Sequence, residues 1–515
     1  MHKTIATFLL ISAVMAGAAY AEGPPAVKVS LEESIRSALE NNVDISVQRS
    51  KPVASAQDVQ VAESAFDSAL FGGVSYSKTM TPSTSALSSP SVGETSGSTA
   101  SLGVKQKLMF GTSYSLTLDA TQSNSNSTYA GINPQYTSNL ALALTQPLLK
   151  GAGSDVNGAQ VTIAKNTKGI SDEDFANGVM NILTQTQETY WDLVYLGKQL
   201  AVQMESVERA RDLKKQIELK VQVGVLAPIE VTAAEATVAT REEELIATRQ
   251  AIQNAEDNLK KLMNRKDTPL GSPVPVVPSD EAAYKEVVLN LEQLKTAAYE
   301  NRPDYRQAHL ALESKRTELA YNENQLYPTV DLQGSVKFKG VRGAGQTVTF
   351  GGQQITSTFD GTQSDAFGDM AGGKTYDYSV GLSLEYPLFN RGAKSRVAKS
   401  MVEVDASQMT VTSLRMAIDL QVLSAARAVE TAAQSVKATA VSRELAEKKL
   451  AAEMSKYDAG TSTSYLVLQY QNDLAAAKSK EIKAVIDHLK AIARLDLATG
   501  ATLQNHGVTL AQREQ

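Results

Sequence analysis

The chain has 515 residues, a formal net charge of −6 and no cysteine. The missing cysteine excludes disulfides, thiolate metal sites and thiol chemistry, and it also excludes lipid attachment through an N-terminal cysteine. Moderate acidity without a basic tract argues against a nucleic-acid partner, and abundant alanine with only 6% aromatic residues suits long packed helices.

Residues 1–21 have the features of a secretory signal peptide. His2 and Lys3 form a short basic start, the following stretch is mostly apolar, and Ala19-Tyr20-Ala21 fits the small-x-small cleavage pattern. The apolar stretch is short for a membrane-spanning helix, and no other stretch is long and apolar enough to be one. If the protein crosses a membrane, a β-barrel is therefore the remaining route.

The first half begins with a predicted helix from Leu31 to about Leu70, because apolar residues recur at every fourth position. Near Phe71 the period changes from helical to alternating, which predicts strands around 114–120 and 140–144. The Ser-, Thr-, Asn- and Gly-rich stretches Thr81 to Ser98 and Gln122 to Gln135 are predicted to be exposed loops.

A long helix is predicted next. After Gln146-Pro147-Leu148 a proline-free helical pattern runs over about 156–223, breaks at Gly224 to Pro228, and resumes until about Asn264. A helix of about 67 residues is roughly 100 Å long at about 1.5 Å per residue. No ordinary globular domain needs a helix of that length.

The second half follows the same plan. A helix is predicted over about 291–326, strands with one apolar face over 330–338 and 378–386, and a Gly-rich loop over Gly340 to Gly373. A proline-free helix over about 393–457 is broken at Gly460, and a last helix over about 465–499 precedes a polar, loose tail.

The two halves indicate a tandem duplication. Gln146-Pro147-Leu148 returns as Tyr386-Pro387-Leu388 about 240 residues later, and Gly224 has its counterpart in Gly460. The predicted organisation is a signal peptide (1–21), a first repeat (22–264), a Pro-rich connection (265–289), a second repeat (290–499) and a polar C-terminal tail (500–515).

The predicted strands have the dimensions of outer-membrane barrel strands, with one apolar and one polar face. Four to six strands per chain cannot close a barrel, since the smallest need about eight, and an open sheet edge cannot face lipid. The strands would therefore close a barrel together with strands of other copies. The residues do not determine the number of copies. They also leave open whether the strand pair around Leu102 to Ala120 joins the barrel or lies above it.

In this order of elements, essentially the whole mature chain resembles the TolC-like outer-membrane efflux family, or outer membrane factors. The matching stretches are Leu31 to Asp44, Leu291 to Asp304, Leu326-Tyr327-Pro328 and the two strand-end motifs. The resemblance implies an α+β membrane protein: a homotrimeric β-barrel in outer-membrane lipid, continued by a long α-helical barrel through the periplasm. It also implies a periplasmic adaptor (membrane fusion) protein and an inner-membrane pump or ABC transporter as partners.

The family's helical-hairpin tips carry a glycine motif that meets the adaptor. The matching residues here are Val223, Gly224, Val225 and Leu226 in the first tip and Ala459, Gly460 and Thr461 in the second. Glycine permits positive φ at a helix end, so a plain helix cap accounts for both glycines as well. The resemblance adds a docking role.

The second tip departs from the family pattern. Where the best-known members carry two aspartates of an acidic ring, this chain has Leu466 and Gln469, and Ser462 replaces a latching arginine. Glu230 retains an acid at the first tip. The acidic ring and ionic latch are therefore not expected, and closure is expected to rest on packing of Tyr465, Leu466 and Gln469.

Catalytic chemistry is not expected. The four histidines, His2, His309, His488 and His506, are scattered, and no nucleophile elbow, phosphate loop or paired carboxylates are apparent. We therefore expect no enzyme, no cofactor and no metal site, and Trp191 is expected to be a packing anchor.

The favoured function is a passive outer-membrane channel-tunnel of a tripartite efflux or type I secretion system. Its localisation would be the outer membrane, with the helical part in the periplasm. The alternative is a structural periplasmic coiled-coil rod with a soluble β head. The residues do not identify the cargo.

Overall fold

The computed structural model describes residues 26–82 and 90–510, so the predicted signal peptide lies outside the described residues. The chain divides into two compact units. The first contains Met1–Val47, Gly178–Asn301 and Ile418–Gln515, and the second contains Gln48–Asn177 and Arg302–Ala417.

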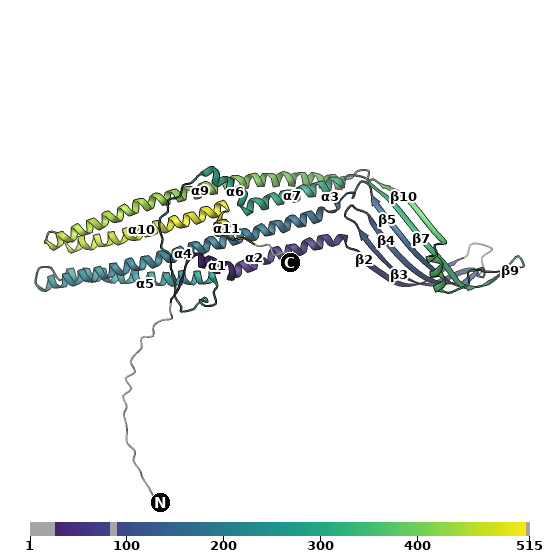
Figure 1. Cartoon of the computed structure of the whole chain (residues 1–515), viewed down its shortest axis with the longest axis horizontal. Coiled ribbons are helices and arrows are strands. Elements are labelled where there is room, and N and C mark those ends of the chain that lie inside the picture. Colours follow the sequence, from purple (N-terminus) through teal and green to yellow (C-terminus); the bar gives the residue numbers. More distant parts are fainter. Residues whose placement is uncertain (1–25, 83–89, 511–515) are drawn as a thin grey trace, which may run out of the picture. The chain divides into compact units, whose positions relative to one another are not determined.

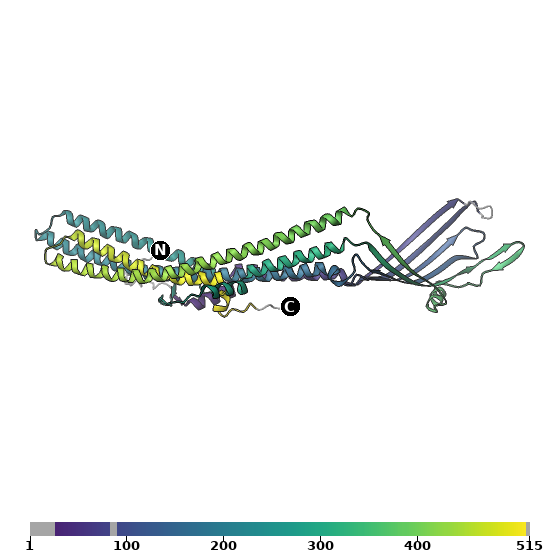
Figure 2. The same cartoon turned by 90° about the horizontal axis from the view of Figure 1, so that it is seen from above.

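Two helical hairpins form most of the first unit, and the longer helix of each hairpin begins in the second unit. Helix α4 (Ala159–Gln222) turns back into α5 (Ile229–Met263), and α9 (Arg391–Asp458) turns back into α10 (Ser464–Thr499), as Figures 1 and 2 show. The returning helices end at residues with positive φ, Asn264 (45°) and Gly500 (73°), as helix C-caps require. These four helices start and end close to their predicted limits.

The single helix predicted from Leu31 to Leu70 is wrong. The segment instead forms α1 (Leu31–Asn41), α2 (Val43–Glu63), a 3-10 turn η1 (Ser64–Phe66) and the start of a strand. Asn42 separates the helices because its buried Nδ2 donates to the carbonyl of Leu262 at 2.9 Å, while its Oδ1 accepts from the N–H of Asp44 at 2.8 Å. The same side chain thus anchors the break and caps α2.

The helix predicted over 291–326 is also interrupted. It consists of α6 (Leu291–Asn301) and α7 (Pro303–Asn324), with Arg302 in an extended conformation between them. Pro303 has no backbone N–H to continue α6, but its fixed φ suits the first turn of α7.

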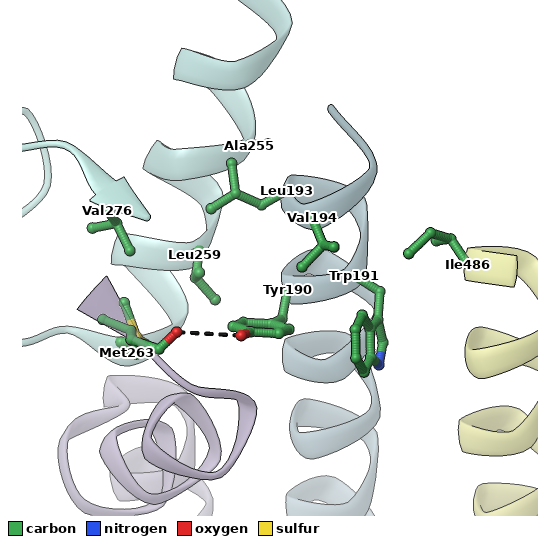
Figure 3. Packing of buried hydrophobic residues seen from close by; sticks show 10 residues of the cluster. Tyr190, Trp191, Leu193, Val194, Ala255, Leu259, Met263, Val276 and Ile486 are labelled. Carbon is green, nitrogen blue, oxygen red and sulfur yellow. Dashed lines mark hydrogen bonds between the residues drawn. The ribbon is translucent and has the colours of Figure 1, made fainter. Parts of the chain in front are cut away.

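The connection between the repeats packs against the helices of the first unit. Its strand β6 (Val276–Pro278) pairs in parallel with β1 (Val27–Val29). Figure 3 shows the adjoining core, in which Tyr190 hydrogen-bonds the carbonyl of Val29 and Trp191 packs edge-on to Tyr190. Trp191 is a packing anchor, as predicted. The wider cluster contains Leu193, Val194, Ala255, Leu259, Met263, Val276 and Ile486.

The prediction of a loose C-terminal tail is wrong for its first part. Helix α11 (Thr502–Asn505) begins at Thr502, which is fully buried. His506 then lies within hydrogen-bond distance of Gln187, with 2.6 Å between the two Nε2 atoms. Residues 511–515 lie outside the described residues.

The second unit contains one six-stranded antiparallel sheet (Figure 1), with strand order β10-β7-β5-β4-β3-β2. Its strands are β2 (Ala69–Pro82), β3 (Val92–Lys107), β4 (Ser113–Ser125), β5 (Ile132–Pro147), β7 (Thr329–Gly345) and β10 (Thr375–Glu385). The two predicted Ser- and Thr-rich loops are largely wrong, because their outer parts belong to these strands. Small polar residues there lie on both faces of the sheet.

The predicted Gly-rich loop over Gly340 to Gly373 is wrong too. It holds the end of β7, a hairpin of β8 (Thr347–Phe350) with β9 (Gln353–Thr356), and α8 (Gln363–Ala371). Gly340 lets α8 lie against the sheet, because a Cβ at this position would come within 1.8 Å of the Ala366 carbonyl oxygen. Gln363 Nε2 also donates to the hydroxyl of buried Ser138 at 2.8 Å.

Candidate functional site: a two-faced sheet and two helical tips

The sheet separates apolar from polar side chains across all six strands. One row of cross-strand neighbours is entirely apolar: Leu70, Val104, Leu116, Leu142, Val336 and Tyr378. The adjoining row, one residue along each strand, is small or polar: Ala69, Lys105, Ser115, Ala143, Ser335 and Ser379. Because side chains alternate between faces, the sheet has one apolar and one polar face.

Much of the apolar face is exposed in a single chain, and α8 covers the end of this face near Gly340 and Ser138. Leu70 is 73% exposed and Tyr378 is 74% exposed, and Val74, Val380, Leu382 and Leu384 are exposed as well. Soluble monomers rarely expose contiguous apolar surface on this scale. Such a face requires an apolar environment, and an outer-membrane barrel supplies one.

The sheet has two open edges. Among the described residues, strands β2 and β10 each pair with one neighbour, so the outer backbone groups of both strands have no partner within this sheet. Each unpaired group costs several kcal/mol in hydrocarbon. A membrane location therefore requires both edges to pair with further strands.

The strand-end motifs lie where strands pass into helices. Pro147 is the last residue of β5, and the N–H of Leu148 donates to the carbonyl of Val330 at 2.8 Å. Tyr386, Pro387 and Leu388 follow β10, and Leu388 is highly exposed. The two motifs thus occupy equivalent chain positions, each between a strand and the start of a long helix.

Both helical tips close with the same backbone motif. At the first, the N–H of Gly224 donates to Val221 at 3.0 Å and that of Val225 donates to Lys220 at 2.8 Å. At the second, the bonds from Gly460 to Tyr457 (3.1 Å) and from Thr461 to Lys456 (2.9 Å) repeat the pattern. This is the Schellman motif, which needs positive φ, and φ is 77° at Gly224 and 76° at Gly460.

The outermost tip residues are solvent-accessible. Val223 is 73% exposed and Val225 is 69% exposed, and Ala459 and Thr461 are exposed too. A Cβ added to Gly224 or Gly460 would meet no atom within 4 Å. The tips thus offer small or apolar side chains and open backbone to a partner.

The tip hairpins pack on a shared core. Ile217, Leu450 and Val467 are buried in it, and half-buried Leu226 packs against it. The ammonium of Lys220 lies 3.6 Å from the ring centroid of Tyr457. Neither Lys220 nor Tyr457 was singled out in the sequence, although each lies three or four residues before a tip glycine.

The structure pairs two of the five predicted constriction residues with other side chains. Ser464, which sequence reasoning missed, donates to Glu230 Oε2 at 2.5 Å and joins α10 to α5. Ser462 donates to Glu453 Oε1 at 2.5 Å. The Ser462 hydroxyl, with the Lys456 ammonium, lowers the pKa of Glu453 below its usual value.

The other three constriction residues remain outside the core of a single chain. Tyr465 is 71% exposed, Gln469 is exposed and Leu466 is half-buried. Because these side chains are not buried in a single chain, a closing role for them requires neighbouring copies.

Within residues 26–82 and 90–510, no helix is long and apolar enough to cross a membrane. The same residues contain no group of three or more His, Asp or Glu side chains placed to hold a metal ion.

The chain matches the family model described as "Outer membrane efflux protein" over residues 113–265 and 294–501. It is 23% identical to "Nodulation protein T" of Rhizobium leguminosarum bv. trifolii over 61% of this chain and 62% of that protein. It is 25% identical to "Toxin and drug export protein A" of Aggregatibacter actinomycetemcomitans over 33% and 36% of the two chains. The chain thus aligns with less than two thirds of each of these relatives' lengths.

Solved outer-membrane channels share the fold. The Campylobacter jejuni CmeC channel superposes with a TM-score of 0.64 at 14% identity, over 100% of this chain and 99% of that one. The Vibrio cholerae outer membrane protein VceC superposes with a TM-score of 0.62 at 14% identity, over 91% and 96%. Because the family model covers most of the chain, this protein belongs to the outer membrane efflux protein family.

Proposed function

We propose that this protein is the outer-membrane channel of a tripartite efflux or type I secretion system. The observation that carries the proposal is the six-stranded sheet with one exposed apolar face and two open edges. Lipid covers the apolar face, and strands from further copies of the chain supply the missing hydrogen-bond partners at the two edges.

The proposed assembly is a homotrimer, the copy number that the resemblance to TolC-like channels implies. Sheets from the three chains would close one barrel in outer-membrane lipid, and the long helices would form an α-helical barrel in the periplasm. The proposed chain organisation is two repeats, 22–264 and 290–499, joined by the connection 265–289.

The two tips are the proposed contact for a periplasmic adaptor. Exposed apolar side chains at Val223 and Val225 and accessible backbone at Gly224 and Gly460 suit close approach of another protein. Between copies, Tyr465, Leu466 and Gln469 are the proposed closing residues. The adaptor would connect the channel to an inner-membrane pump or ABC transporter, which selects the cargo, so passage through the channel itself is passive.

The test is native mass spectrometry of the protein extracted from outer membranes with detergent. A mass of three mature chains is expected. A stable monomer, or release into the soluble periplasmic fraction without detergent, would contradict the channel. Either result would instead favour the coiled-coil rod with a soluble β head.

A further inference from the structure

The β3–β4 hairpin lies inside the sheet, between β2 and β5. β3 pairs with β2 over Val92–Lys105 and with β4 over Thr95–Lys107, and β4 pairs with β5. Neither strand of the hairpin forms an edge. The strand pair around Leu102 to Ala120, whose place the sequence left open, is therefore part of the same sheet.

The hairpin also continues both faces of the sheet. On the apolar face Leu102 lies opposite Leu118, which lies opposite Leu140, which in turn lies opposite Phe338. On the other face, Ser101 lies opposite Asp119, and Asp119 lies opposite Asn139. A hairpin lying above the membrane would not be stabilised by having its apolar residues in register with those of the neighbouring strands.

With six strands in the sheet, the directions of the two edge strands allow one copy to pair with the next. All neighbouring pairs in the sheet are antiparallel, so β2 and β10 run in opposite directions. β10 of one copy can consequently pair antiparallel with β2 of the next, as strands do in outer-membrane barrels. Exposed Val74 on β2 and Val380 on β10 belong to the same apolar face, which would continue across the seam.

We infer that the hairpin is part of the channel wall, so each copy contributes six strands and three copies form an eighteen-stranded barrel. The inference rests on the proposed membrane channel and adds the size of its pore. With strands about 4.8 Å apart and tilted by about 40°, eighteen strands enclose a backbone diameter of about 36 Å. Twelve strands, the number without the hairpin, enclose about 24 Å. Barrels of 16–18 strands hold an aqueous channel.

The first test places nitroxide spin labels on the hairpin in lipid vesicles, using the natural absence of cysteine. Leu118→Cys and Thr117→Cys are neighbours on β4 that point to opposite faces. Leu382→Cys and Ser383→Cys form the matched control pair on β10. The Leu118 and Leu382 labels should collide mainly with oxygen dissolved in lipid, and the Thr117 and Ser383 labels with a water-soluble nickel chelate.

The control pair distinguishes failure of this inference from failure of the channel. If β10 alternates between lipid and water while both β4 labels contact only the nickel chelate, the hairpin is outside the wall and the inference is overturned. If no label reaches lipid in assembled protein, the membrane channel itself is contradicted. Leu102→Cys and Ser101→Cys on β3 repeat the measurement should a β4 variant fail to assemble.

The second test cross-links the seam. Val74→Cys is combined in turn with Tyr378→Cys, Val380→Cys and Leu382→Cys, so that three registers between copies are sampled. At least one pair should oxidise to a covalent trimer on non-reducing gels, while Leu118→Cys with Val380→Cys should not. Cross-linking only through Leu118, or no cross-link from Val74 in an assembled trimer, would overturn the six-strand wall.

Discussion

The hydroxyl of Tyr190 donates to Oδ2 of Asp280 at 2.7 Å, and the same carboxylate oxygen accepts from the N–H of Leu31 at 2.6 Å. The N–H of Asp280 in turn donates to the Tyr190 hydroxyl at 3.2 Å. One buried phenol and one carboxylate therefore join α4, the connection between the repeats and the first turn of α1. Asp280 also places a negative charge at the N-terminus of α1, where it is favourable.

Removing this hydroxyl should destabilise the first unit. We expect Tyr190→Phe to lower the free energy of unfolding by about 1–3 kcal/mol, because half-buried groups on Asp280 lose a partner. The measurement is chemical unfolding of the detergent-solubilised protein followed by circular dichroism. Tyr195→Phe removes a hydroxyl from the same helix outside this network and should change stability less; an equal loss would show that the network contributes nothing.

The same residue predicts a dependence on alkaline pH. Burial, with the adjacent Asp280 carboxylate, raises the pKa of Tyr190 to about 12, so the folded state favours the neutral phenol. The contribution of the neutral Tyr190 phenol to folding stability is fully present below about pH 10, the pKa of an unfolded tyrosine. This contribution is lost as pH rises through 12. The stability difference between wild type and Tyr190→Phe should therefore shrink between pH 10 and 12, and a constant difference would contradict this.

Much of the helical plan follows from local signals. Gly224, Gly460, Asn264 and Gly500 stop helices because they accept positive φ, and long proline-free stretches mark the helices between them. Alternating apolar residues likewise predicted the strand faces. The family match confirms the predicted class, an outer-membrane efflux protein and not an enzyme.

The errors arise where a distant contact decides the local structure. In the sequence nothing distinguishes Asn42 from an asparagine within a helix, because its hydrogen bond to Leu262 is a distant contact. Gly340 likewise suggested a loop, because the packing of α8 against it is visible only in the structure. Ser464 carries no signal for its partner Glu230, which is far away in the sequence. The tip and constriction roles remain predictions.

Substitutions on the two sheet faces should have unequal effects. Leu382→Arg or Leu384→Arg puts a charge on the apolar face, at a cost of roughly 2–4 kcal/mol near the bilayer midplane. Ser383→Arg places the same side chain on the polar face, opposite Asp331, and should be tolerated. The measurement is the yield of trimer in the outer membrane. Comparable yields for all three variants would show that the assigned faces, or the barrel, are wrong.

The tip glycines should contribute modestly to stability. Gly224→Ala forces positive φ on a residue with a Cβ, which costs about 1 kcal/mol, but the added atom meets no neighbour. Gly197 is a matched control because it lies inside α4 with equally open space. Alanine there should stabilise by about 0.5–1 kcal/mol. Effects of the same sign at both sites in thermal unfolding would contradict the assigned conformations.

Docking can be separated from this cap role by adding bulk at both tips. Gly224→Trp with Gly460→Trp should leave the trimer intact, because α4 and α9 have already packed over many turns before each glycine. Export should fall sharply, since an indole on an exposed turn keeps the adaptor from approaching the backbone.

Trimer yield, cross-linking to the cognate adaptor and export are measured in the same cells, with Gly224→Ala/Gly460→Ala as the control for strain alone. Loss of export in the alanine pair would assign the defect to strain. Unchanged cross-linking and export in an intact tryptophan trimer would leave the tips as ordinary helix caps.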